Sequence, residues 1–180
     1  MNTERLVIGA QAFFFRNATA FTVPEAGTAG RTAKPGAADP KWINLGVSNW
    51  KFRNTGETQD FFAPAPGVRV LWDKITTKKG LKLSATLMEL QNLTYQLLLS
   101  TDHLPDAGTA GGQFNPMEGE PVVRGWLQLQ QYDQHNVLVN TMDVFVAMNI
   151  PGDVDFGEGP VDVDVECDVL FSTLNTGNLR

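Results

Sequence analysis

Acidic residues near the C-terminal end are the first candidates for chemistry. Asp153, Asp155 and Glu158 supply hard oxygen ligands of the kind that Ca²⁺ takes, in a segment rich in Gly, Pro and Asp. They lack the ligand spacing and the late bidentate Glu of an EF-hand loop, so we favour a segment without a specific calcium site. A second acidic set follows, in which four acids alternate with apolar residues: Asp162, Asp164, Glu166 and Asp168.

This alternation predicts a strand over residues 161–173. Every second side chain of a strand points to the same face, with neighbours on that face about 7 Å apart. The apolar set from Val161 to Phe171 is expected to face the core, and the four acids to face outward. Two interpretations of the acidic face stay open: a solvated surface matched by cross-strand lysines, or a surface meant to be negative. Local pairing is not available, because no Lys or Arg lies between Gly125 and Leu179.

Nucleophile and phosphate-binding motifs are missing from the sequence. The single cysteine, Cys167, lies in register with valines, so we expect a buried apolar side chain. A catalytic thiol needs a histidine partner, and His103 and His135 both lie in polar, loop-like segments. The sequence contains no GxxxxGK[ST], GxGxxG, CxxC, HExxH or GxSxG pattern. We therefore predict a protein that is not an enzyme and takes no cofactor and no structural metal.

Charge is divided unevenly along the chain. Residues 1–90 hold twelve Lys or Arg against seven Asp or Glu, whereas residues 91–180 hold two against thirteen. The densest basic cluster is Lys78, Lys79 and Lys82, and the sequence pI is about 4.8. A DNA-binding protein usually has a basic face and a high pI, so the composition argues against that class. A chain with a basic part and an acidic part can instead pair with copies of itself.

The elements that must position these residues are mostly strands. We expect strands within residues 5–16, 42–54, 81–89, 122–133, 137–150 and 161–173, and one helix at 90–100. Two Gly- and Pro-containing loops, 24–41 and 101–121, have no periodicity. The predicted fold is a single mainly β domain over residues 1–180, a β-sandwich or barrel with one short α-helix. No signal peptide is evident at residues 1–16, and no apolar run approaches the ~20 residues that span a bilayer.

Residues 57–79 predict an extended hairpin, which we call the arm. Both ETQDFF and VRVLWDKITT have strand character, but the prolines of the APAPG between them cannot donate to a β-ladder. The arm is therefore expected to bend between Pro64 and Gly67, and a turn is expected at Lys78, Lys79 and Gly80. The residues proposed for contacts between copies are Phe61, Phe62, Pro64, Pro66, Gly67, Trp72, Lys78 and Lys79.

Three stretches after Trp42 share a diffuse pattern with one family. They are WINLGVSNWKF followed by FFAPAPG and VLWDKITTKKG; LKLSATLMELQNLTYQLLL; and VVRGWLQLQQYDQHNVLV with VFVAMNI. Together they resemble the tail tube (major tail) proteins of long-tailed bacteriophages. Loops 24–41 and 101–121 depart from that family's pattern.

The resemblance implies a structural virion protein whose hexameric rings stack into a tube. Its partners would be other copies of itself, the tape measure protein and the tail terminator and tip proteins. The lumen would be negative, so that DNA passes during ejection without specific binding, and the subunit would be made in the host cytoplasm and end in the virion tail. The acidic face from Asp162 to Asp168 would line or edge that lumen, and the arm would carry contacts between rings.

Two other classes remain alternatives. One is a different virion structural protein, such as a capsid decoration or head–tail connector subunit. The other is a carbohydrate- or calcium-binding β-sandwich module, in which the tryptophans would form a platform. Tryptophans are more often core or interface residues, and we favour that interpretation for Trp42, Trp50, Trp72 and Trp126.

Overall fold

The computed structural model confirms a mainly β protein, and the residues that it describes include one short helix. It describes residues 7–16, 42–64, 67–88, 92–100, 117, 119–157 and 161–179. The described elements are β1 (Val7–Arg16), β2 (Ile43–Ser48), β3 (Lys51–Ala63), β4 (Val70–Leu87), α2 (Asn92–Leu99), β5 (Val123–Asp133), β6 (Leu138–Asn149), β7 (Val163–Val169) and β8 (Thr176–Leu179). Loop 24–41 and most of loop 101–121 lie outside these ranges.

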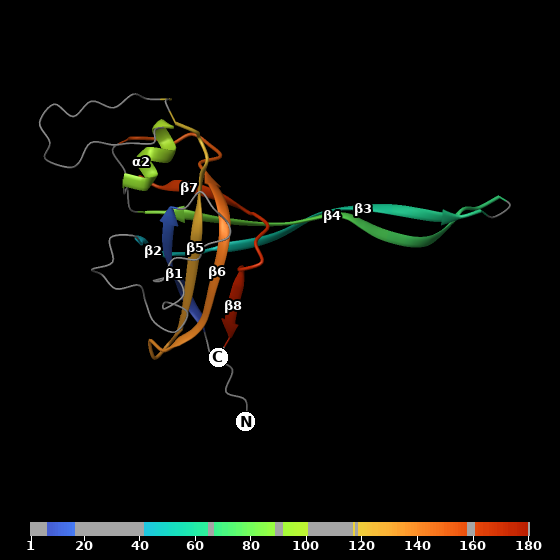
Figure 1. The fold of residues 1–180 in the computed structure, drawn as a ribbon, viewed down its shortest axis with the longest axis horizontal. Coiled ribbons are helices and arrows are strands. Elements are labelled where there is room, and N and C mark those ends of the chain that lie inside the picture. Colours follow the sequence, from blue (N-terminus) through green and yellow to red (C-terminus); the bar gives the residue numbers. More distant parts are fainter. Residues whose placement is uncertain are drawn as a thin grey trace, which may run out of the picture.

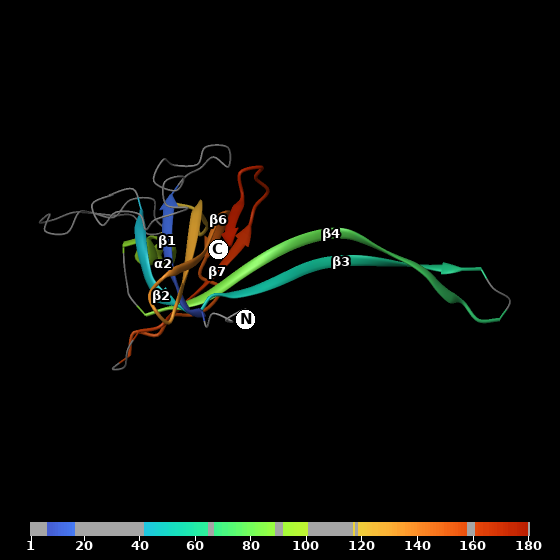
Figure 2. The same ribbon diagram turned by 90° about the horizontal axis from the view of Figure 1, so that it is seen from below.

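All the described strands belong to one antiparallel sheet that curls on itself (Figures 1 and 2). The order is β2-β1-β5-β6-β7-β4-β3, and β8 also pairs with β6. The outermost strands, β2 and β3, are joined by Asn49 and Trp50 alone, so the two ends of the sheet must meet. Leu45 of β2 and Leu83 of β4 share one core cluster, which is the packing expected of a barrel-like body.

One edge of β6 is divided between two partners. Its residues Val146 to Asn149 pair with β7, and Asn140 to Asp143 pair with β8. The chain crosses between them at Phe145, whose carbonyl accepts a hydrogen bond from Leu170 N and whose amide donates to Asn175 Oδ1 at 2.8 Å. These bonds satisfy the backbone groups of Phe145, which pairs with neither strand on this edge.

The inner face of the curled sheet holds the main core. Val163, Val165 and Cys167 of β7 are fully buried there, as their alternation with acids predicts. The helix α2 adds Leu93 and Leu97 to the same cluster and closes the end of the body at which β5 begins (Figure 1). Core burial therefore fixes which face of β7 is apolar, and it leaves the acids outside.

A second cluster covers the outer face of β1, β5 and β6. Trp126 and Phe145 meet there with ring centroids 5.5 Å apart, and Trp42 and Phe13 join them. Because both faces of β5 are covered, Trp126 to Gln130 are all buried, although the strand alternates apolar and polar residues. Burial on both faces is unusual for an antiparallel strand of this pattern, and the alternation alone did not indicate it.

Besides the strand expected over residues 42–54, which the structure divides into β2 and β3 at Asn49 and Trp50, two local sequence predictions are wrong. Lys78, Lys79 and Gly80 form no turn, because they lie inside the continuous strand β4 and pair with Glu57, Gly56 and Thr55 of β3. A Cβ atom on Gly80 would lie 2.6 Å from Thr55 Oγ1, so this glycine allows a close cross-strand approach.

The second error concerns Phe171, which was expected to share the core face with the valines. Strand β7 ends at Val169, and the chain then turns toward β8, so the side chain of Phe171 is 83% exposed. The strand is shorter than the residue pattern because β6 changes partner at this point.

Candidate functional site: the arm and the acidic face

The most prominent feature is the hairpin of β3 and β4, whose outer part extends away from the body (Figures 1 and 2). The two strands pair from Lys51 opposite Ser84 to Ala63 opposite Val70. Nearly every side chain of β3 is exposed, and β4 becomes buried only from Leu83 inward. An isolated two-stranded hairpin is at best marginally stable in water, so this arm is expected to have a partner.

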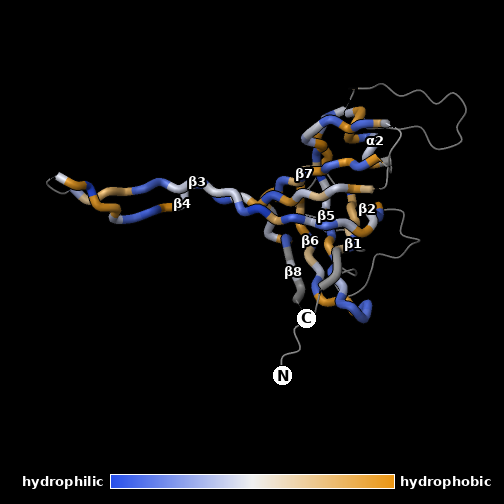
Figure 3. The backbone as a smooth tube through the Cα atoms, turned by 180° about the vertical axis from the view of Figure 1, so that it is seen from behind, coloured by the Kyte–Doolittle hydropathy of each residue, from blue (hydrophilic) through white to orange (hydrophobic). Residues whose placement is uncertain are grey.

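The outer half of the arm contains hydrophobic residues (Figure 3), and several of their side chains are exposed. Trp72 is 79% exposed and Phe62 is 52% exposed. Other exposed apolar side chains of this region are Phe61, Val68, Val70, Leu71 and Ile75. Several apolar side chains exposed together at one end of a hairpin are typical of an interaction site rather than of a free surface.

Two β-bulges shape the arm. At the outer bulge, Phe61 pairs with Asp73 and Phe62 with Leu71, so Trp72 is the extra residue without a cross-strand partner. At the inner bulge Thr77 is the extra residue, and its Oγ1 donates to Glu57 O at 3.0 Å. Bulges redirect side chains and increase local twist, and here one of them presents Trp72 to solvent.

The middle of the arm is polar. Lys78 Nζ lies 2.8 Å from Glu57 Oε2, and Lys74 Nζ lies 3.6 Å from Asp60 Oδ1. Exposed pairs of this kind contribute only about 0.2–1 kcal/mol each, so they favour the strand register more than they stabilise the arm. Lys79 is exposed in the same stretch, away from the turn.

The structure places the other arm residues of the sequence prediction near the turn. Phe61, Phe62 and Trp72 lie close to the outer end, and Pro64 directly follows β3. Gly67 has a φ of 91°, which favours glycine at this bend. Pro66 lies outside the described residues.

The acidic face of β7 is partly neutralised from another strand. Lys82 of β4 reaches Glu166 Oε1 at 2.9 Å and Asp168 Oδ1 at 3.3 Å. Hydrogen bonds to Glu166 and then Asp168 raise the pKa of Lys82, so the amine is charged at neutral pH. The sequence left cross-strand lysines open as partners of the acids, and Lys82 is such a lysine.

The remaining acids of this face, Asp162 and Asp164, are not the ones that Lys82 contacts. Asp164 accepts a hydrogen bond from Thr86 Oγ1 at 2.6 Å, and Asp162 is exposed just before β7 begins. On β3, Lys51 pairs with Ser84 and Arg53 with Lys82, so two more basic residues lie on the same side of the sheet, one strand beyond β4. The negative surface is therefore concentrated at Asp162, Asp164 and the exposed Asp153 and Asp155 before them.

Comparison of the chain with protein-family models and with curated proteins finds no match. The likeness to tail tube proteins therefore remains a resemblance, and the arguments about function depend on the geometry.

The other residues considered for chemistry lie apart. Among the described residues, no three His, Cys, Asp or Glu side chains come close enough to hold a metal ion, and Glu158 is outside that set. Cys167 is fully buried, and burial raises the pKa of its thiol, which makes it a poor nucleophile. His135 is exposed in the β5–β6 turn, and His103 is not described. Within the described ranges, no helix is long and apolar enough to cross a membrane.

Two features escaped the sequence analysis. One is a buried polar chain in which Tyr132 OH donates to Gln130, Gln130 Nε2 donates to Gln128, and Gln128 Nε2 donates to Asp143 at 2.9 Å. The only sequence signal was that these glutamines share a face with Trp126. The other feature is a pocket beside Trp50, whose walls come from strands far apart in the sequence.

Proposed function

We propose that the protein is a tail tube subunit of a long-tailed bacteriophage, assembled as stacked hexameric rings. The observation that carries this proposal is the arm, which exposes aromatic and aliphatic side chains at its outer end, away from the body. The arm cannot bury this surface within its own chain. A subunit that polymerises through the arm would cover it at every contact.

The charge distribution supports repeated contacts between copies. The hairpin of β3 and β4, with the arm at its outer part, holds seven Lys or Arg and three Asp or Glu among its described residues from Lys51 to Lys82. In residues 119–157 and 161–179, by contrast, Arg124 is the one Lys or Arg. Opposite charges on different parts of one surface favour heterologous association, in which a basic part of one copy meets an acidic part of the next.

The acidic residues fit a lumen that DNA crosses without sticking. DNA-binding proteins gain affinity by neutralising phosphates, and a carboxylate-lined wall has the opposite effect. In our proposal Asp162 and Asp164 edge the lumen, together with Asp153 and Asp155. Glu166 and Asp168 contribute less, because Lys82 neutralises part of their charge. Ring symmetry would repeat each carboxylate around the bore.

The test is assembly with and without the arm. Replacing residues 58–77 with Asn-Gly would close a short hairpin on the pair formed by Glu57 and Lys78. Light scattering and negative-stain microscopy should show rings or tubes for the wild type, and a folded subunit that no longer stacks for the shortened variant. A wild type that stays monomeric at high concentration under all salt conditions would overturn the proposal. Tubes formed equally well without the arm would remove the observation on which it depends.

A further inference from the structure

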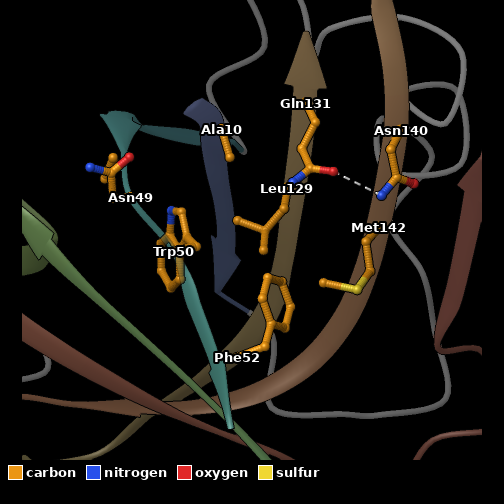
Figure 4. Close-up of a pocket in the computed structure, with 9 residues that line it drawn as sticks. Ala10, Asn49, Trp50, Phe52, Leu129, Gln131, Asn140 and Met142 are labelled. Atoms are coloured by element: carbon orange, nitrogen blue, oxygen red, sulfur yellow. Dashed lines mark hydrogen bonds between the residues drawn. The ribbon is translucent and has the colours of Figure 1, made fainter. Parts of the chain in front are cut away.

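A pocket of about 370 Å³ opens in the body beside the base of the arm (Figure 4). Trp50, Phe52, Leu129 and Met142 form its apolar walls. Leu129 and Met142 come from the ends of β5 and β6 that lie away from α2, so the pocket lies toward the open end of the curled sheet. At its rim, Asn140 Nδ2 donates to Gln131 Oε1 at 3.1 Å. None of the described residues that line the pocket is charged, which favours an apolar or neutral occupant.

Two buried polar atoms at this pocket have no partner among the described residues. They are Trp50 Nε1 and Ser48 Oγ, and both residues line the cavity. A buried indole N–H without an acceptor costs about 1–3 kcal/mol, so such groups usually mark a missing partner. Both atoms are enclosed, so an occupant that offers a carbonyl oxygen satisfies Trp50 once the indole turns toward the cavity.

The outer end of the arm has the matching properties. Trp72 is the extra residue of the bulge at this end and is mostly exposed. Phe62 and Leu71 form the neighbouring cross-strand pair. Aromatic side chains bury about 150–250 Å² each, so Trp72 and Phe62 supply at most about 300–500 Å² of the ~800 Å² per partner of a standard interface, and Leu71 and the neighbouring apolar residues add to this area. The backbone around a bulge also has carbonyl groups that the β-ladder does not use.

The arm cannot fill the pocket of its own chain. Phe52 lines the pocket and pairs with Leu83, whereas Trp72 lies beside the pair formed by Phe61 and Asp73, nine residues further along β3. At about 3.3 Å per residue this separates Trp72 from the pocket by roughly 30 Å. The pairing of β3 with β4 is continuous apart from the two bulges, so the arm is not free to fold back.

We propose that the outer end of the arm, led by Trp72, docks into this pocket of a second copy of the chain. The inference rests on the proposed function and assigns the surface that receives the arm. Trp72 and its apolar neighbours lie against Phe52, Leu129 and Met142 of the receiving copy. Trp50 of that copy turns its indole toward the arm and donates its N–H to a backbone carbonyl there.

Such a contact can repeat from one copy to the next, because each subunit has both the arm and the pocket beside Trp50. The two surfaces are different and lie apart on the molecule, so the interface is heterologous and does not close as a twofold dimer. A docked pair therefore still has one free arm, on the receiving copy, and one empty pocket, on the copy whose arm is docked. A stack of rings requires this property.

Disulfide trapping between two variants tests the contact. Asn49 is an exposed lining residue of the pocket, so Asp73→Cys, which is next to Trp72 and leaves it in place, is mixed with Asn49→Cys under mild oxidation. The native Cys167 is buried with a raised thiol pKa, so it does not compete. We expect a cross-linked dimer on a non-reducing gel. The matched control mixes Asp73→Cys with Phe171→Cys, at a position that is 83% exposed but outside the pocket, and should give little product. Preferential trapping at Phe171 would overturn the docking site.

Assembly of two further variants separates this inference from the tube proposal. Trp72→Ala should raise the concentration needed for assembly about tenfold or more, as expected for a central aromatic contact. Trp50→Phe keeps the pocket's shape and should leave the melting temperature of the isolated subunit unchanged or higher, while still weakening assembly. If the wild type assembles and both variants assemble equally well, the docking inference fails and the tube proposal survives. If the wild type does not assemble at all, both fail.

Discussion

Lys82 Nζ on β4 lies 2.9 Å from Glu166 Oε1 on β7, and the same amine lies 3.3 Å from Asp168 Oδ1. One lysine from the base of the arm therefore binds two carboxylates of the acidic face. The contact ties the arm to the body at the point where the hairpin leaves the sheet. It also divides the four acids into two that have a basic partner and two, Asp162 and Asp164, for which no salt bridge to a described residue is found.

Replacing Lys82 should make the melting temperature less sensitive to a rise in pH above neutral. The carboxylate partners raise the pKa of Lys82, so its contribution is present below the usual lysine pKa and is lost as pH rises through the raised value. We expect Lys82→Met to lower the melting temperature slightly at neutral pH, with the difference from wild type shrinking above about pH 10. Thermal unfolding across this range measures the effect. Lys78→Met, on the exposed arm, is the control and should change little; equal melting curves for Lys82→Met and wild type at pH 7 would contradict the prediction.

Two leucines of the same strand should behave differently. Leu83 is fully buried, so Leu83→Ala is expected to reduce the free energy of unfolding by about 2–5 kcal/mol. Leu71 is half exposed near the end of the arm, so Leu71→Ala should change subunit stability by less than about 0.5 kcal/mol and weaken association instead. Urea denaturation of each full-length variant, at protein concentrations below the onset of assembly, measures subunit stability, and light scattering at higher concentration measures association. A large loss of subunit stability from Leu71→Ala would show that the arm packs on its own body.

Gly125 should not tolerate a side chain. A Cβ atom at this position would lie 2.3 Å from Phe15 O and 2.5 Å from Phe14 Cζ, so β1 would have to move. We expect Gly125→Ala to cost about 1–3 kcal/mol in the free energy of unfolding. Gly152→Ala is the matched control, because a Cβ there meets nothing within 4 Å. Similar urea midpoints for the two variants would mean that β1 and β5 are less closely packed.

The buried glutamine chain should be intolerant of apolar replacement. Gln128→Leu removes the donor to Asp143 Oδ1 and the acceptor of Gln130 Nε2, both in a fully buried setting. A buried polar group that loses its partner costs about 1–3 kcal/mol, so the variant should be clearly destabilised in chemical denaturation. Gln131→Leu, where the side chain is only half buried, should cost less. A reversed order of stability would argue that the network contributes little.

Charge reversal at the acidic face tests the lumen directly. Asp162→Lys combined with Asp164→Lys should fold and assemble, because both positions are exposed. Tubes of this variant should retain DNA that wild-type tubes release, with a strong dependence on salt. The measurement is DNA co-sedimentation with assembled tubes at several ionic strengths, together with electron microscopy of the tube. Placement of both carboxylates on the outer surface of the assembly would contradict the lumen proposal.

The strand pattern of β7 shows how much the sequence could determine. Apolar residues alternate with acids from Val163 to Asp168. This period of two assigns the buried and exposed faces without any knowledge of neighbouring strands. Similarly local signals predicted the mainly β class, the helix α2 and the interruption near Pro64. Each of these depends on residues within a few positions of one another.

The contacts that matter for function depended on the tertiary structure. Lys82 meets Glu166 across 84 positions of the chain, and the pocket beside Trp50 combines residues from β1, β3, β5 and β6. Local signals at Lys78 and Gly80 suggested a turn, but pairing with Glu57 and Thr55 continues the strand through them. Likewise, Phe171 follows the apolar pattern of β7 but lies beyond the point where β6 changes partner. A strand obtains its hydrogen bonds from other strands, so its length, its neighbours and the covering of its second face are decided by distant segments of the chain.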